Sequence, residues 1–93
     1  MKKYELMAIY PLDDEQSKKS AEELKGTLTN IGAEITEEKP FGDRDLTYEI
    51  KKQKKGRFVL YTMKLNPSKI VEIEKAFKIN MGLLKYQFVR IDE

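Results

Sequence analysis

The chain has 93 residues, enough for one domain and too few for a second hydrophobic core, so we expect a single domain over residues 1–93. It contains no cysteine and no histidine, which excludes disulfides, thiolate metal sites and histidine general bases. Its 18 Lys+Arg residues against 16 Asp+Glu give a net charge of +2, a weaker basic balance than a free-standing nucleic-acid-binding protein shows.

The charges are grouped along the chain. Positive charge collects at Lys2-Lys3, from Lys51 to Arg57 and from Lys75 to Arg90, whereas the acidic groups lie mainly between residues 13 and 45. Grouped charges can create a local positive field on a nearly neutral protein. The alternative is that the charged side chains only keep a small domain soluble, and for any one group this is the commoner reason.

The beginning of the chain predicts a cytoplasmic location. Residues 1–5 lead into a short mixed run that does not resemble the core of a signal peptide, and no apolar stretch approaches the length of a membrane span.

A strand followed by a helix is predicted first. Tyr4, Leu6, Ala8 and Tyr10 alternate over residues 4–10, and Pro11 ends the strand because proline cannot donate to the ladder. Asp13 then suits a helix N-cap, completed by Gln16 three places on. Ala21, Leu24, Leu28 and Ile31 recur at helical spacing, and Gly32 suits the position just past the helix.

The second strand is predicted to start near Ala33 and to be interrupted at Pro40-Phe41-Gly42. A proline would leave a hydrogen bond missing in a central strand, so this strand belongs at a sheet edge or carries a bulge. The strands at 4–10 and 57–65 contain no proline and can lie in the middle.

Residues 42–65 predict an antiparallel hairpin. One arm carries Leu46, Tyr48 and Ile50 at a spacing of two, and the other carries Val59, Tyr61, Met63 and Leu65 in the same way. The link from Lys51 to Gly56 contains four lysines and a glycine able to take a positive φ, which is typical of a solvated turn.

A second helix and a last strand complete the pattern. Asn66 suits the N-cap with Pro67 at the first helical position, and Ile70, Ile73, Ala76 and Phe77 form the buried stripe. The final strand is predicted from Leu84 to Ile91, with Tyr86 and Phe88 on one face.

The element order predicts an α+β, ferredoxin-like β-α-β-β-α-β two-layer sandwich. The four-stranded antiparallel sheet has the order 4-1-3-2, and both helices cover one face because crossovers are right-handed. The predicted helix-facing residues are Tyr4, Leu6, Ala8, Tyr48, Ile50, Tyr61, Met63 and Phe88, and the open face presents Met7, Ile9, Phe58, Leu60 and Val89. Such an apolar face indicates a partner, although scattered surface apolar residues are also ordinary.

The sequence predicts neither an enzyme nor a metal or cofactor site, since it lacks a nucleophile–base pair, metal-ligand spacing and a Gly-rich phosphate loop. Lys55-Gly56 before an aromatic-rich strand is similar to the RNA-recognition-motif signature. Arg57 and Val59 stand where that motif has aromatics, so RNA contacts are expected mainly to phosphates.

Several segments together resemble one family. They are the Met1–Leu6 start, Gly32-Ala33, the run from Gly42 to Ile50 with its Gly-x-Arg-x-Leu-x-Tyr pattern, Lys55-Gly56-Arg57-Phe58 and the ending from Asn80 to Arg90. In order and spacing they are similar to the family of the protein numbered six in the bacterial small ribosomal subunit, over nearly the whole chain.

The resemblance implies a function and two sets of site residues. It implies a ferredoxin-like structural protein, ribosome-associated in the cytoplasm, that binds the central domain of 16S ribosomal RNA as a heterodimer with small-subunit protein eighteen, with no membrane and no small-molecule substrate. The implied RNA-facing residues are Lys2, Lys3, Lys78, Asn80, Lys85 and Arg90, and Arg44, Leu46 and Tyr48 would receive the partner.

Two differences from the family pattern reduce positive charge. Arg44-Asp45 stands where the family usually has two adjacent basic residues, and Leu84 stands where arginine is common. We therefore expect low RNA affinity in the absence of the partner.

An alternative function is a regulatory or small-molecule-sensing domain that acts as a homodimer through the open sheet, a common use of the same fold. It requires a pocket with convergent polar groups, for which the sequence offers no candidate.

Overall fold

A computed structural model describes residues 2–80 and 82–91. The elements in chain order are β1 (Lys2–Tyr10), α1 (Asp14–Ile31), β2 (Glu34–Ile50), β3 (Gln53–Leu65), a 3₁₀ turn (Pro67–Lys69) that continues into α2 (Ile70–Ile79), and β4 (Lys85–Ile91). The predicted β-α-β-β-α-β order is confirmed. Neither helix in the described part of the chain is long and apolar enough to span a membrane.

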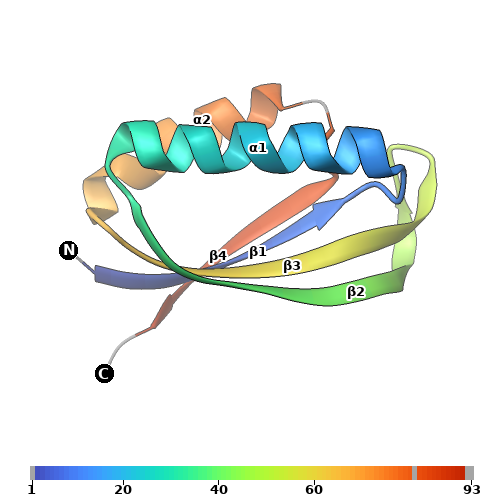
Figure 1. Ribbon diagram of the computed structural model, residues 1–93, viewed down its shortest axis with the longest axis horizontal. Coiled ribbons are helices and arrows are strands. Elements are labelled where there is room, and N and C mark those ends of the chain that lie inside the picture. Colours follow the sequence, from blue (N-terminus) through green and yellow to red (C-terminus); the bar gives the residue numbers. More distant parts are fainter. Residues whose placement is uncertain (1, 81, 92–93) are drawn as a thin grey trace.

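The four strands form one antiparallel sheet in the order β2-β3-β1-β4, which is the predicted 4-1-3-2 counted from the other edge. Both helices lie on the same side of it, as predicted (Figure 1). β1 and β3 are therefore central, and the proline-containing β2 is an edge strand. Since each edge strand has one unpaired side, β2 and β4 are the two places where another molecule can approach the backbone.

The core lies between the helices and the sheet. Tyr4, Leu6 and Ala8 of β1 and Tyr61 and Met63 of β3 are buried there, as predicted, against Leu24 and Leu28 of α1 and Ile73 and Phe77 of α2, while Phe88 packs against this cluster. The prediction for Tyr48 is wrong, because its side chain is 75% exposed. The alternation that placed it in the core assumes continuous pairing with β3, and that pairing is interrupted after Asp45.

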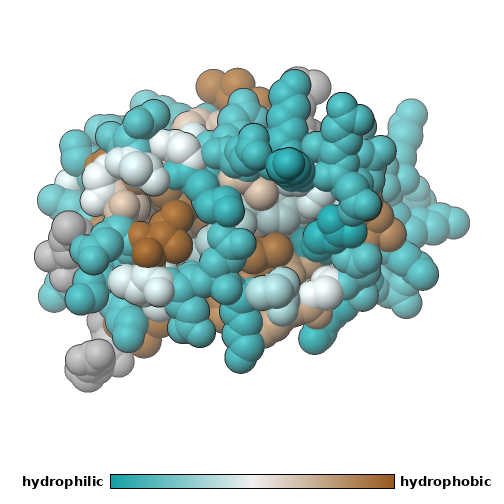
Figure 2. All heavy atoms as spheres, viewed as in Figure 1, coloured by the Kyte–Doolittle hydropathy of each residue, from teal (hydrophilic) through white to brown (hydrophobic). Residues whose placement is uncertain are grey.

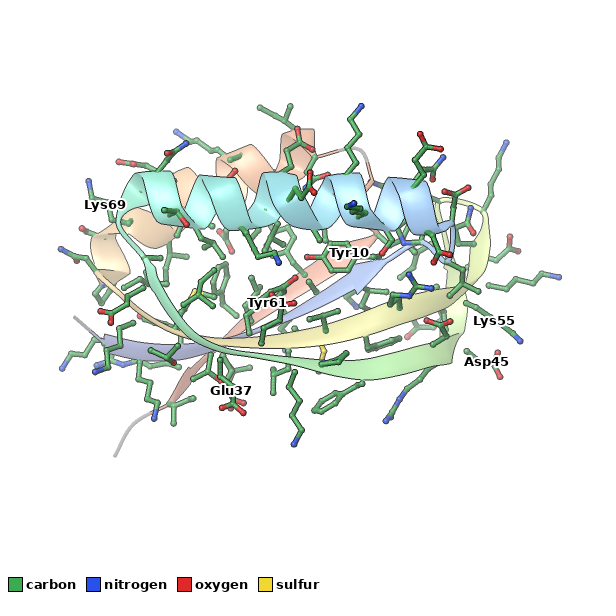
Figure 3. The ribbon with its side chains drawn as sticks, in the orientation of Figure 1. Tyr10, Glu37, Asp45, Lys55, Tyr61 and Lys69 are labelled. Carbon is green, nitrogen blue, oxygen red and sulfur yellow. The ribbon has the colours of Figure 1, made fainter. Side chains whose placement is uncertain are left out.

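Two tyrosines form a polar contact inside this core. The hydroxyl oxygens of Tyr10 and Tyr61 are 2.7 Å apart, and Figure 3 shows the two rings pointing toward each other between α1 and the sheet. Burial raises the pKa of both phenols, that of Tyr61 to about 12. The hydrogen bond satisfies two hydroxyls that would otherwise be costly to bury.

The predicted helix ends are confirmed. The Asp13 carboxylate accepts a hydrogen bond from the Gln16 backbone N–H at 3.0 Å, and Gly32 ends α1 with φ +95°. The Asn66 side chain accepts from the Ser68 N–H at 3.1 Å. The turn that follows Asn66 is 3₁₀ rather than α, a common way for a helix to begin.

The turn of the β2–β3 hairpin differs from the prediction. The residues with positive φ are Lys51 (49°) and Lys52 (65°), as a two-residue hairpin turn requires, whereas Gly56 lies inside β3 and is buried. A Cβ on Gly56 would lie 2.5 Å from Ile9 Cγ2 and 3.4 Å from Leu46 Cδ2. Gly56 is therefore required by close packing, not by the turn.

One residue predicted to be exposed on the open face, Ile9, is buried. Met7, Phe58 and Leu60 are half-buried and Val89 is exposed, but Ile9 is only 8% exposed because β2 approaches it over Gly56. On the side of the molecule seen in Figure 2, hydrophilic side chains cover most of the surface and apolar atoms show in separate spots.

Candidate RNA and protein-partner interfaces

Three of the residues predicted to contact RNA lie at one end of the sheet. Lys2 and Lys3 begin β1, and Arg90 stands opposite Tyr4 near the end of β4. The start of β1 and the end of β4 lie at the same end of the molecule in Figure 1. The fold thus brings together cations that are almost a full chain length apart in the sequence.

The other predicted cations lie near the opposite end of β4. Lys78 is in the last turn of α2, and Lys85 begins β4 opposite Ile9. Lys85 and Arg90 are five positions apart on one strand, or roughly 17 Å at the usual rise per residue. Their side chains also point to opposite faces, because Arg90 pairs with the core-facing Tyr4 and Lys85 with Ile9. The cations therefore follow the β4 edge on both sides.

Asn80 does not share the exposed position of these cations. Asn80 is the C-cap residue of α2, where its backbone N–H donates to the Phe77 carbonyl, and the residue is only 5% exposed. The Ser20 hydroxyl donates to Asn80 Oδ1 at 2.9 Å, and Asn80 Nδ2 donates to the Ser20 carbonyl at 3.1 Å. Direct RNA contact by Asn80 conflicts with this burial, and the side chain instead connects α2 to α1.

The positions that correspond to aromatics in the RNA recognition motif face the helices. Val59 pairs with the buried Ala8, and Arg57 pairs with Tyr10 on the same side of the sheet. Base stacking on this strand would require them to face the open side. These two positions therefore do not form a base-stacking surface on the open face of the sheet.

The predicted partner residues lie on β2, at the other edge of the sheet. Arg44 is exposed, with its guanidinium carbon 5.8 Å from the centre of the Phe41 ring. Leu46 is half-buried and Tyr48 is exposed. The partner residues thus share the β2 edge strand, whereas the predicted RNA residues are spread over β1, the end of α2 and β4.

Leu46 and Tyr48 belong to an irregular segment of β2. The ladder pairs Asp45 with Lys55 and resumes at Ile50 and Gln53, so residues 46–49 of β2 stand opposite the single residue 54 of β3. We call residues 46–49 the β2 bulge. Bulges at sheet edges redirect side chains, and this one gives Tyr48 its exposed position. Beyond it, Lys51 Nζ donates to the Leu83 carbonyl at 2.9 Å and connects the hairpin tip to the segment before β4.

A groove of about 260 Å³ separates the β2 bulge from the sheet. Its lining is mostly apolar and comprises Met7, Ile9, Asp45, Leu46, Thr47, Tyr48, Ile50, Phe58, Lys85, Tyr86 and Gln87. It places Lys85, predicted for RNA, beside Leu46 and Tyr48, predicted for the partner. The sequence does not predict that Lys85 lies beside Leu46 and Tyr48, because their proximity depends on how far the β2–β3 hairpin bends toward β4.

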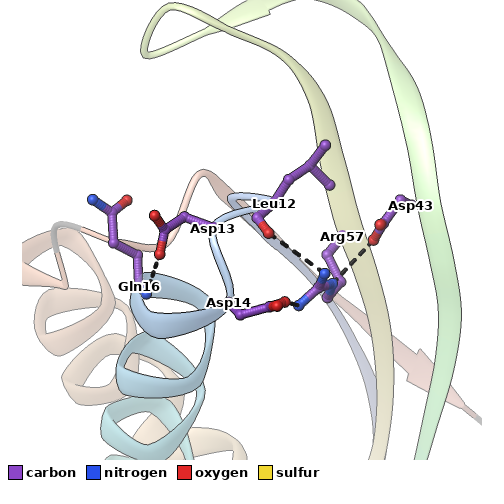
Figure 4. A network of polar contacts seen from close by, with 6 residues as sticks. All are labelled: Leu12, Asp13, Asp14, Gln16, Asp43 and Arg57. Atoms are coloured by element: carbon purple, nitrogen blue, oxygen red, sulfur yellow. Dashed lines mark hydrogen bonds and ion pairs between the residues drawn. The ribbon is translucent and has the colours of Figure 1, made fainter.

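Arg57 forms a polar network at the base of the same hairpin, which the sequence did not predict. Arg57 Nε donates to Asp43 at 3.0 Å, Arg57 Nη1 donates to Asp14 at 3.0 Å, and Arg57 Nη2 donates to the Leu12 carbonyl at 3.5 Å (Figure 4). The hydrogen bonds to Asp43 and then to Asp14 raise the pKa of Arg57 above its usual range. The only signal in the sequence was an arginine in a strand whose pattern calls for an apolar residue.

The acidic side chains in the described part of the chain form no candidate metal site. Among them, no group of three or more Asp or Glu side chains is placed to hold a metal ion. The acidic side chains near one another, such as Asp14 and Asp43, are bonded to Arg57.

Comparison with known proteins identifies the family. The family model described as ribosomal protein S6 matches residues 3–90. The chain is 43% identical to small ribosomal subunit protein bS6 of Treponema denticola over the full length of both, and 36% identical to that of Halalkalibacterium halodurans, also over both full lengths. Its fold matches the crystal structure of 30S ribosomal protein S6 from Thermotoga maritima with a TM-score of 0.85, covering 97% of this chain and 87% of that one at 22% identity. The chain therefore belongs to the ribosomal protein S6 family and is a non-enzymatic, ribosome-associated protein of the small ribosomal subunit in the cytoplasm.

Proposed function

We propose that this chain, as a single domain over residues 1–93, binds the central domain of 16S ribosomal RNA together with small-subunit protein eighteen. The β4 edge contacts RNA phosphates, and the β2 edge receives the partner. The observation that carries the proposal is that the partner residues lie on the β2 edge strand, whereas the predicted RNA cations lie on β1, β4 and the end of α2.

The RNA contact is supported by the exposure of the cations along β4. Lys2, Lys78, Lys85 and Arg90 are exposed and Lys3 is half-buried, and none of them supports the core. Side chains of this kind neutralise phosphates without reading the base sequence. Because the net charge is only +2, the affinity of the chain alone is low, and the partner supplies the remainder.

An RNA titration with and without protein eighteen tests this contact. Replacing Lys2, Lys3, Lys85 and Arg90 by alanine lowers RNA affinity and leaves the unfolding transition unchanged. The matched control replaces Lys25 and Lys55, which are paired with Glu38 and Asp45 of β2 at the other edge of the sheet, and leaves affinity nearly unchanged. Equal losses in both variants would contradict a localised RNA surface.

Salt dependence provides a second measurement. If about four to six phosphates are neutralised, log K falls by roughly three to five units per tenfold rise in salt concentration. A flat dependence would contradict the phosphate contacts.

The partner contact is supported by the β2 bulge and its groove. Tyr48 offers an aromatic ring to solvent beside an apolar groove, an arrangement typical of interface anchors. Tyr48→Ala therefore weakens binding of protein eighteen in calorimetry. Val71→Ala, which removes an exposed apolar side chain from α2, is the control and leaves binding unchanged.

The homodimeric sensor alternative is not retained. The full-length relatives of this chain are small-subunit ribosomal proteins.

A further inference from the structure

We propose that Arg57 is a positioning residue for the partner surface, holding the β2 bulge in the conformation that exposes Tyr48. The inference rests on the proposed function, since it assumes that Tyr48 and Leu46 receive a protein partner. Arg57 itself faces the helix side of the sheet and acts through the strand it holds.

The backbone ladder is weak on both sides of the β2 bulge. On one side, the register shifts between Pro40 and Gly42, and Gly42 has φ +85°. On the other side, pairing is lost from Asp45 to Ile50. Only residues 42–45 are regularly paired between these two irregularities. The direction in which the bulge leaves the sheet therefore depends on how firmly this short stretch is held.

Arg57 of β3 lies directly opposite this short paired stretch of β2. Asp43 is the direct cross-strand neighbour of Arg57, and the 3.0 Å hydrogen bond between their side chains reinforces the pairing. The same guanidinium reaches Asp14 at the start of α1 and the Leu12 carbonyl in the β1–α1 connection. One side chain thus ties the base of the bulge to two other parts of the chain.

The guanidinium of Arg57 is suited to bind two carboxylates. Its planar fork presents several donors in fixed directions, so it can hold Asp43 and Asp14 at once, which the point charge of a lysine does less well. The Arg57 side chain is only 31% exposed, so water competes for it less than for a surface cation. By contrast, Lys55 and Asp45, the next ion pair on the same two strands, are 3.9 Å apart with both side chains largely exposed, and contribute little.

The contrast between these two cations defines the experiment. Arg57→Met retains the aliphatic stem and removes every donor, and Lys55→Met removes one charge from the same strand as the matched control. Binding of protein eighteen is measured by calorimetry at a temperature where urea unfolding shows both variants folded. We expect about tenfold weaker binding for Arg57→Met and a change of less than about twofold for Lys55→Met.

Hydrogen exchange on the free protein provides a measurement that needs no partner. The backbone amides that pair residues 42–45 with β3 exchange faster in Arg57→Met than in the wild type, while those of β1 are unchanged. In Lys55→Met both sets behave as in the wild type. Equal exchange of residues 42–45 in all three proteins would overturn the inference.

A double variant separates positioning from direct contact. If Arg57 acts by holding Asp43, then Arg57→Met, Asp43→Ala and the double variant bind the partner about equally weakly, because each removes the hydrogen bond between Arg57 and Asp43. Losses that add up would mean separate contacts with the partner and would overturn positioning. If wild-type protein does not bind protein eighteen at all, the proposed function fails, and the exchange measurement still decides whether Arg57 holds the bulge.

Discussion

At the scale of single residues, Tyr10 and Tyr61 show how a buried polar pair is coupled to stability. Tyr10→Phe leaves the Tyr61 hydroxyl without its buried partner and is expected to lower the free energy of unfolding by about 1–3 kcal/mol. The double variant Tyr10→Phe/Tyr61→Phe removes both hydroxyls and is expected to be no less stable than the single one. Urea denaturation measures both, and a double variant with twice the loss would contradict the pairing.

The same pair predicts a pH dependence. Burial raises the pKa of Tyr61 from 10.0 to about 12, so the unfolded chain loses this proton more readily than the folded one. The contribution to stability is fully present below about pH 10 and is lost as the pH rises through about 12. Urea midpoints measured from pH 9 upward should therefore fall more steeply for the wild type than for the double phenylalanine variant. Parallel curves would show that the pair is not the cause.

Two glycines provide a matched pair of substitutions. Gly56→Ala places a methyl against Ile9 Cγ2, and because Ile9 is β-branched and cannot easily move aside, we expect a loss of about 1–3 kcal/mol. Gly26→Ala, inside α1 with nothing within 4 Å of the new Cβ, is expected to gain roughly 0.5–1 kcal/mol. Thermal unfolding distinguishes the two, and a stabilising Gly56→Ala would show that Ile9 and β3 separate readily.

At the scale of elements, Asn80 and Ser20 connect the C-terminus of α2 to the middle of α1. Asn80→Ala removes both hydrogen bonds and is expected to cost about 1–3 kcal/mol in unfolding free energy. Ser20→Ala serves as comparison, and the double variant should cost less than the sum, because the two residues share a bond. RNA affinity of the folded Asn80→Ala protein should stay close to that of the wild type. A large loss of affinity without loss of stability would restore Asn80 as a direct contact.

At the scale of the whole molecule, the two edges of the sheet should act separately except where the groove joins them. Lys2→Ala is expected to weaken RNA binding alone, and Tyr48→Ala to weaken partner binding alone. Lys85→Ala should weaken both, because Lys85 begins β4 and also lines the groove beside Tyr48. Parallel titrations with RNA and with protein eighteen test this, and a Lys85→Ala variant that binds the partner normally would place Lys85 outside the interface.

The sequence alone determined the elements of this protein and their order. The signals that predicted them are local: the alternation in residues 4–10, the cap at Asp13 and the αL glycine at Gly32. Each depends only on the conformational preferences of neighbouring residues. The edge position of β2 also followed from the sequence, because Pro40 lacks the donor that a central strand needs.

Only the tertiary structure decided how the surfaces are built. The β2 bulge broke the alternation that had placed Tyr48 in the core, and Gly56 serves the approach of Ile9 and Leu46 rather than a turn. The hydrogen bonds between Asn80 and Ser20 and between Arg57 and Asp14 connect residues that are 60 and 43 positions apart in the sequence. Such contacts depend on the packing of elements distant in the chain, and no local pattern of residues records which side chains the completed fold will bring together.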